Sequence, residues 1–137
     1  KAVLIYWVLG ATDGHAKNFS IRLNPDGRFR LAPLYDVLST QPHVATGQLT
    51  KKNARLAMAV GKSRHYRMDE VVPRYFRETA DAVGFAKSEL DAIEKDIADK
   101  LESAIKTATD SLPKDCPKAL GDAIAAGARE RVALFEL

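Results

Sequence analysis

Three polar residues near the start of the chain have types and a spacing that could support phosphoryl transfer. Asp13 is followed five positions later by Asn18, within the segment Asp-Gly-His-Ala-Lys-Asn, and a second aspartate, Asp36, comes further along the chain. An Asp-x4-Asn pair with a later aspartate is how kinases place their catalytic base and magnesium ligands. The spacing therefore predicts that Asp13 takes the proton of the attacking hydroxyl, while Asn18 and Asp36 bind the Mg²⁺ ions that bridge the ATP phosphates.

The residue types suit this chemistry because the transferred phosphoryl group carries dense negative charge. Mg²⁺ takes oxygen ligands, usually one or two carboxylates together with substrate phosphates. The Asp36 carboxylate and the Asn18 amide oxygen are such ligands, and the neutral amide adds no charge that would repel the phosphates. Asp13 must stay outside the metal site if it is to orient and deprotonate the acceptor hydroxyl.

Two further residues of this segment could take part in the chemistry, and each has a structural alternative. His15 could stabilise the phosphoryl oxygens or brace the loop, or it could be a loop histidine hydrogen-bonded to the backbone. Lys17 could neutralise phosphate charge or be a solvated lysine. Asp13 and Asn18 are themselves residue types that turns and helix caps often use. The elements around the motif favour the catalytic interpretation.

The segment before the motif is an apolar run that is expected to lie in the core. Residues 2–9 are almost uniformly apolar and end at Gly10, which predicts a buried helix, with a strand as the alternative. The run could be mistaken for the apolar part of a signal peptide, but no cleavage site with small residues follows it. Residues 10–18 then form a polar loop, where catalytic side chains are commonly placed.

The segment after the motif is predicted to be a β-hairpin. Residues 19–23 and 28–31 alternate apolar and polar side chains on either side of the turn sequence Asn-Pro-Asp-Gly. Such a hairpin carries the chain away from Asn18 and back again. We therefore expect Asp36, which follows the second strand, to return beside the loop.

The remainder of the chain is predicted to be mostly helical. Residues 39–66 have an irregular pattern, with a short helix expected at most around 53–60. Apolar residues then recur at helical spacing in three segments. These helices are expected over 69–83 with Pro73 in the first turn, over about 90–109 after a capping box at 88–91, and from Pro117 at its first position to about Phe135. The predicted fold class is mainly α (α+β overall), with one small β-hairpin next to the catalytic loop.

Length, charge and cysteine content restrict the class of protein. A chain of 137 residues is long enough for one domain with a modest core. Its 21 basic and 18 acidic residues give a net charge of +3, which is too small to indicate a nucleic-acid-binding surface. The single cysteine, Cys116, excludes an internal disulfide and is typical of a reducing compartment such as the cytoplasm. No apolar run approaches the roughly 20 residues that cross a bilayer, so no membrane association is expected.

Two segments resemble the HipA family of bacterial serine/threonine-protein kinases, which are the toxins of type II toxin–antitoxin pairs. The first segment is Leu-Gly-Ala-Thr-Asp-Gly-His-Ala-Lys-Asn-Phe-Ser over 9–20, and the second is Leu-Ala-Pro-Leu-Tyr-Asp-Val-Leu over 31–38. The Asp-Gly-His-x-x-Asn core is also similar to the loops of phosphoinositide kinases and of aminoglycoside and choline phosphotransferases. The Ala-Pro-x-Tyr-Asp frame around Asp36 points to HipA, and weaker similarity covers essentially the whole chain.

The resemblance implies a protein-kinase-like C-terminal lobe with Mg²⁺ and ATP as cofactors. It assigns the catalytic base to Asp13 and the magnesium ligands to Asn18 and Asp36. His15 and Lys17 would belong to the catalytic loop, and Lys17 would also bind the nucleotide. It further implies a protein substrate, such as an aminoacyl-tRNA synthetase or another translation protein. The implied partner is a HipB-like DNA-binding antitoxin, and the kinase would contact DNA only through this antitoxin.

The sequence departs from that of a complete kinase in one respect. It contains no glycine-rich phosphate loop and no strand lysine ahead of the motif. Residues 1–137 are therefore expected to be the C-terminal lobe of a larger protein whose nucleotide-binding part precedes Lys1, and to be inactive alone. Two alternatives stay open. One is a small-molecule or lipid phosphotransferase that shares the loop, and the other is a non-catalytic helical module that binds a partner.

Overall fold

The apolar segment at the start of the chain is the predicted helix, and it is buried. In the computed structural model, which describes residues 1–135, helix α1 spans Ala2–Leu9. Apolar residues lie on every side of this helix, and other elements cover it on most sides. The Trp7 side chain is completely buried. The helix ends at Gly10, whose left-handed φ of 67° allows its N–H to donate to the Trp7 carbonyl.

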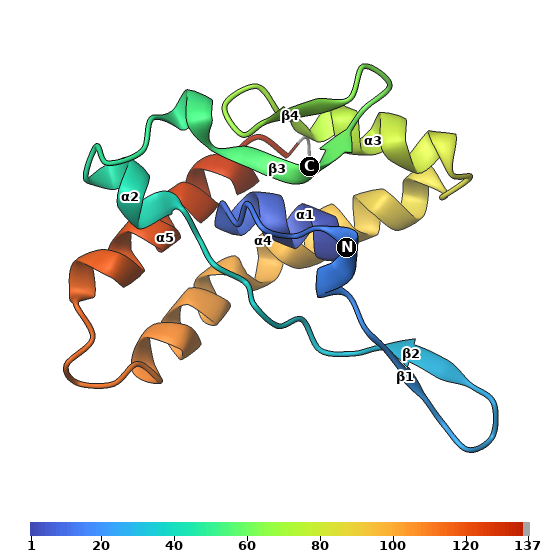
Figure 1. Ribbon diagram of the computed structural model, residues 1–137, viewed down its shortest axis with the longest axis horizontal. Helices are drawn as coiled ribbons and strands as arrows, with labels where there is room; N and C mark the ends of the chain where they lie inside the picture. Colours follow the sequence, from blue (N-terminus) through green and yellow to red (C-terminus); the bar gives the residue numbers. More distant parts are fainter. Residues whose placement is uncertain (136–137) are drawn as a thin grey trace.

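The predicted hairpin after the motif is confirmed. Strand β1 (Ile21–Leu23) pairs antiparallel with strand β2 (Phe29–Leu31). In the turn between them the Asn24 N–H donates to the Arg28 carbonyl at 2.8 Å, and Gly27 takes a φ of 79° that glycine adopts readily. This first hairpin projects away from the rest of the molecule and brings the chain back toward α1 (Figure 1).

A second hairpin takes the place of the short helix expected around residues 53–60, so that expectation is wrong. The expectation of a single hairpin is wrong for the same reason. Strand β3 (Arg55–Val60) pairs antiparallel with strand β4 (His65–Arg67). Leu56 is buried while the residues on either side of it are exposed, which is the alternation of a half-covered strand. Alanine, leucine and methionine favour helices, but burial of one face of the segment outweighs that preference.

Helices form most of the remaining structure; the long ones lie near the predicted segments, and the short ones lie in the segment 39–66, which was predicted to be irregular. Two short ones precede β3 and three longer ones follow β4. They are α2 (Gln41–Ala45), the 3-10 helix η2 (Lys51–Asn53), α3 (Pro73–Ala82), α4 (Lys87–Asp110) and α5 (Lys118–Val132). Within the described part of the chain, none of the helices has the length and apolar character needed to cross a membrane.

The three long helices start at other residues than predicted. Pro73 lies in the first turn of α3, as predicted, but the helix begins at Pro73 itself and not at residue 69. The capping box predicted at 88–91 is wrong, because the Ala86 carbonyl already accepts the N–H of Leu90 and α4 therefore begins before Ser88. Pro117 precedes α5 by one position and is its N-cap residue rather than its first helical residue.

The second hairpin and the long helices enclose α1. Figure 1 shows α1 in the middle, with β3, β4 and α3 above it, α4 passing below it, and α5 running along its left side up toward β3. The Trp7 ring lies 5.3 Å from the ring of Phe76 on α3 and 6.3 Å from the ring of Phe135, measured between ring centroids. On α5, Arg131 donates to the Val8 carbonyl at 3.1 Å. The end of α1, from which the motif begins, is therefore held from several directions.

Candidate active site

The loop that carries the motif, residues 10–18, is closed by its own hydrogen bonds. We call it the Asp13 loop. The Asn18 Nδ2 donates to the Asp13 carbonyl at 2.7 Å, and the His15 N–H donates to the same carbonyl at 2.9 Å. Asn18 ends a single turn of 3-10 helix, η1 (Ala16–Asn18), and is 7% exposed. The five-residue spacing thus lets the asparagine fix the backbone of the aspartate, while the Asp13 carboxylate stays exposed.

Gly14 allows the Asp13 loop to lie directly on α1. A Cβ atom at this position would be 2.5 Å from Cδ1 and 2.6 Å from Cγ of the Tyr6 ring, which is closer than real carbon contacts permit. The same ring meets the edge of the Phe19 ring, with 5.8 Å between the centroids. The loop is therefore held against the last turn of α1 by close packing as well as by hydrogen bonds.

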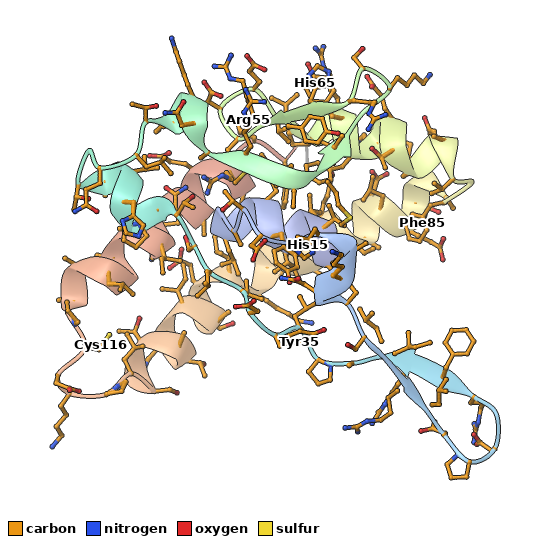
Figure 2. All side chains as sticks on the ribbon, in the orientation of Figure 1. His15, Tyr35, Arg55, His65, Phe85 and Cys116 are labelled. Atoms are coloured by element: carbon orange, nitrogen blue, oxygen red, sulfur yellow. The ribbon has the colours of Figure 1, made fainter. Side chains whose placement is uncertain are left out.

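His15 lies against the carboxylate of Asp13. Its Nε2 is 3.5 Å from Asp13 Oδ1, and both side chains are about half exposed, at 42% and 55%. His15 Nδ1 is buried and has no hydrogen-bond partner among the described residues. Figure 2 shows His15 beside α1, with Tyr35 on the segment that passes below it. The histidine is thus placed to brace or polarise the aspartate, and its role in chemistry stays a prediction.

After the first hairpin the chain returns to the Asp13 loop through residues 32–40, here called the return segment. The Thr40 N–H and hydroxyl both donate to the Gly10 carbonyl at 2.9 Å, which holds this segment against the end of α1. Asp36 lies on the return segment with a φ of 55°, in the left-handed region that residues other than glycine rarely adopt. Such conformations are concentrated at functional sites.

The hydroxyl of Tyr6 contacts the return segment next to Asp36. It donates to the Tyr35 carbonyl, the group directly before Asp36, at 3.5 Å. Burial raises the pKa of Tyr6 above its ordinary value, and the carboxylates of Asp36 and Asp13 raise it further. Because the Tyr6 ring packs against Gly14 and its hydroxyl reaches the Tyr35 carbonyl, the Asp13 loop and the return segment lie on the same side of α1, as the hairpin geometry predicted.

Tyr35 makes a second connection between the return segment and the start of the hairpin. Its hydroxyl shares a hydrogen bond of 2.8 Å with the Ser20 Oγ and donates to the Lys17 carbonyl at 3.5 Å. The Lys17 side chain itself is exposed. Sequence reasoning missed Tyr6, Tyr35 and Ser20. A tyrosine in an otherwise apolar helix was the available signal, since a buried phenol needs a polar partner.

Two residues of the site carry oxygen atoms of the kind that Mg²⁺ takes as ligands. Because Asn18 Nδ2 is used inside the loop, its Oδ1 is the atom that could bind a metal, together with the exposed Asp36 carboxylate. Among residues 1–135 no three His, Cys, Asp or Glu side chains are grouped so as to hold a metal ion. Two oxygen donors suit Mg²⁺, which keeps water ligands and takes others from phosphates.

One comparison with known proteins bears on this arrangement. The sequence model of the family described as HipA-like C-terminal domain matches residues 1–105. The match includes α1, the Asp13 loop, the first hairpin, the return segment, the second hairpin, α3 and most of α4. It therefore covers every residue of the candidate site.

Proposed function

We propose a kinase function from the premise that this chain belongs to the family of HipA-like C-terminal domains. In this proposal the chain is the C-terminal, protein-kinase-like catalytic lobe of a serine/threonine kinase. The reaction is transfer of the γ-phosphate of ATP to a protein hydroxyl. The observation that carries the proposal is that the Asp13 loop and the return segment both contact the Tyr6 side chain, the loop at its ring and the segment at its hydroxyl.

Asp13 is the group that would act on the acceptor hydroxyl. Its carboxylate is exposed, its backbone carbonyl is fixed by Asn18, and His15 lies 3.5 Å from its Oδ1. A carboxylate that is held in place but open to solvent can orient a serine or threonine hydroxyl and accept its proton as the phosphoryl group is transferred. His15 would keep the carboxylate in that orientation.

Asn18 and Asp36 are the residues that would hold Mg²⁺ between the chain and the ATP phosphates. When bound, the ion neutralises charge on the phosphoryl oxygens. Asn18 contributes a neutral oxygen from a buried position, and Asp36 contributes a charged oxygen from an exposed one. The exposed Lys17 side chain could add a positive charge on the nucleotide side. This division leaves Asp13 free of metal and available as the base.

Further parts of the proposal do not depend on the geometry of the site. We propose that residues outside this chain complete the nucleotide site, because the sequence has no glycine-rich phosphate loop. The 137-residue chain is then expected to transfer no phosphate at a useful rate by itself. A DNA-binding antitoxin of the HipB type and a translation protein as substrate are the partners that the family suggests. The cytoplasm is the proposed compartment.

The proposal is tested by following labelled γ-phosphate from ATP·Mg²⁺ in the full-length protein. The acceptors are the protein itself, a cell lysate, and a panel of small-molecule and lipid alcohols. The Asp13→Asn and Asp36→Asn variants are expected to lose labelling of serine or threonine. Asp26→Asn is the matched control, since Asp26 is an exposed aspartate in the hairpin turn that pairs with Arg28.

Two results would contradict the proposal. Label that appears on small alcohols and on no protein would favour a small-molecule phosphotransferase. Absence of transfer by a folded, nucleotide-binding wild-type protein would favour a non-catalytic module that binds a partner.

A further inference from the structure

Tyr6 touches both halves of the candidate site with one side chain. The ring lies under Gly14 of the Asp13 loop, where a Cβ would come within 2.5 Å of it, and its edge-on contact with Phe19 fixes the far end of the loop. The hydroxyl reaches the Tyr35 carbonyl, on the return segment, at 3.5 Å. The tyrosine is 2% exposed, so these contacts determine where its ring and hydroxyl can be.

The hydroxyl of Tyr6 has properties that a positioning group requires. Tyr6 is the one hydroxyl-bearing residue of α1, and the helix places that hydroxyl at the boundary between the core and the polar site. Burial and the neighbouring carboxylates raise the pKa of the phenol, so it keeps its proton and remains a hydrogen-bond donor. A neutral donor can approach both aspartates without the repulsion that a third negative charge would cause.

The backbone next to the Tyr6 contact is the part of the return segment that most needs support. Asp36 has a left-handed φ of 55°, a conformation that persists in residues other than glycine only when the surroundings hold it. The carbonyl that accepts from Tyr6 belongs to the peptide unit joining Tyr35 to Asp36. A hydrogen bond at this peptide therefore acts directly on the orientation of the Asp36 side chain.

We propose that Tyr6 is a positioning residue that sets the placement of the Asp36 carboxylate relative to the Asp13 loop, through its hydroxyl on one side and its ring on the other. This inference rests on the proposed function, because it concerns the site at which Asp36 and Asn18 would hold the metal. Tyr6 itself touches neither substrate nor metal in this role.

The test uses the full-length protein and the variant Tyr6→Phe, which keeps the ring contacts and loses only the hydroxyl. Tyr66→Phe is the control, since it removes a phenol hydroxyl from β4 whose partner, Arg64, is far along the chain from the site. Two quantities are measured at a temperature where all three proteins are folded. One is Mn²⁺ affinity in the presence of ATP, from the spin-resonance signal of free Mn²⁺. The other is amide hydrogen exchange of peptides that cover 32–40.

Tyr6→Phe is expected to weaken Mn²⁺ binding by about fivefold and to accelerate exchange in the return segment by a similar factor, as loss of one hydrogen bond predicts. Exchange in β3 and β4 should not change, and Tyr66→Phe should match the wild type in the metal measurement. Wild-type Mn²⁺ affinity in Tyr6→Phe would overturn this inference and leave the proposed function in place. Equal acceleration of exchange in all peptides would also overturn it, because the hydroxyl would then support the whole fold. A wild-type protein that binds ATP but does not bind Mn²⁺ would overturn both this inference and the proposed function.

Discussion

Replacing Gly14 by alanine should destabilise the protein through a single contact. Gly14 does not have a left-handed backbone, so the cost of a side chain comes from the clash with Tyr6. The new Cβ would lie 2.5–2.9 Å from three atoms of the ring, and the ring cannot turn away because Phe19 lies against it. Forcing an extra carbon into such packing costs about 2 kcal/mol.

The expected change in melting temperature follows from the length of the chain. With an unfolding entropy of about 2.1 cal/mol/K for each of the 137 residues, a loss of about 2 kcal/mol lowers the Tm by roughly 7 °C. Thermal unfolding followed by circular dichroism or calorimetry measures this directly. The loop and Tyr6 must move apart in the variant, so phosphate transfer by the full-length protein should fall as well.

Gly121→Ala is the matched control for this experiment. Gly121 lies inside α5, and a Cβ there would meet Leu112 Cδ1 at 3.6 Å, an ordinary contact. Alanine in a helix interior is favoured over glycine by about 0.5–1 kcal/mol, so this variant should melt slightly higher than the wild type. A Gly14→Ala protein that melts within about 1 °C of the wild type would refute the account of how the Asp13 loop sits on α1.

Two further predictions concern charged side chains. Glu94→Gln should lower the free energy of unfolding by about 3 kcal/mol, measured by urea denaturation, because Glu94 is fully buried and its Oε2 lies 2.6 Å from Arg77 Nη2; an unchanged midpoint would contradict this. Lys1 and Lys100 lower the pKa of Asp96 from 3.8 to about 2, so the stabilisation from the ionised carboxylate is complete above pH 3.8 and is lost as the pH falls through 2. Asp96→Asn should therefore flatten the decline of urea midpoints between pH 4 and pH 2, and a decline as steep as that of the wild type would count against the ion pairs.

The elements with strong local signals could be predicted from the sequence. Residues 2–9 are apolar on every side and stop at Gly10, which favoured a buried helix over the alternative of a strand. The first hairpin has a strong turn sequence between two alternating segments, so its strands formed as expected. In both cases the information lies within a few neighbouring residues.

The second hairpin and the helix starts could not be predicted in the same way. The segment Leu-Ala-Met-Ala within β3 has helix-forming residues, and its strand conformation depends on burial of Leu56 against distant parts of the chain. The helix α4 begins at a backbone carbonyl of Ala86, while the capping-box sequence around Ser88 lies just inside it. Tertiary packing determined both outcomes, and a local sequence pattern carries no information about that packing.

The contacts of the candidate site also include some that the local sequence predicts and others that only the folded chain creates. Asp13 and Asn18 lie on one short loop, so their proximity follows from the sequence, and the hairpin predicted the return of Asp36. The contacts of Tyr6 with Gly14 and with the Tyr35 carbonyl join segments that only the folded chain brings together. The residue types of the motif therefore predicted a chemistry that we propose for this chain, while the contacts of Tyr6 became visible only in the structure.

The most direct test of the proposed roles separates ATP binding from phosphate transfer in the full-length protein. Single-turnover transfer rates and equilibrium affinities for ATP·Mg²⁺ would be measured for the wild type, Asp13→Asn and Asp36→Asn. Asp13→Asn should bind ATP·Mg²⁺ as tightly as the wild type but transfer phosphate about 10²–10⁴-fold more slowly, because it lacks only the base. Asp36→Asn should lose affinity for ATP·Mg²⁺ itself. Transfer by Asp13→Asn at the wild-type rate would contradict the assignment on which the account depends.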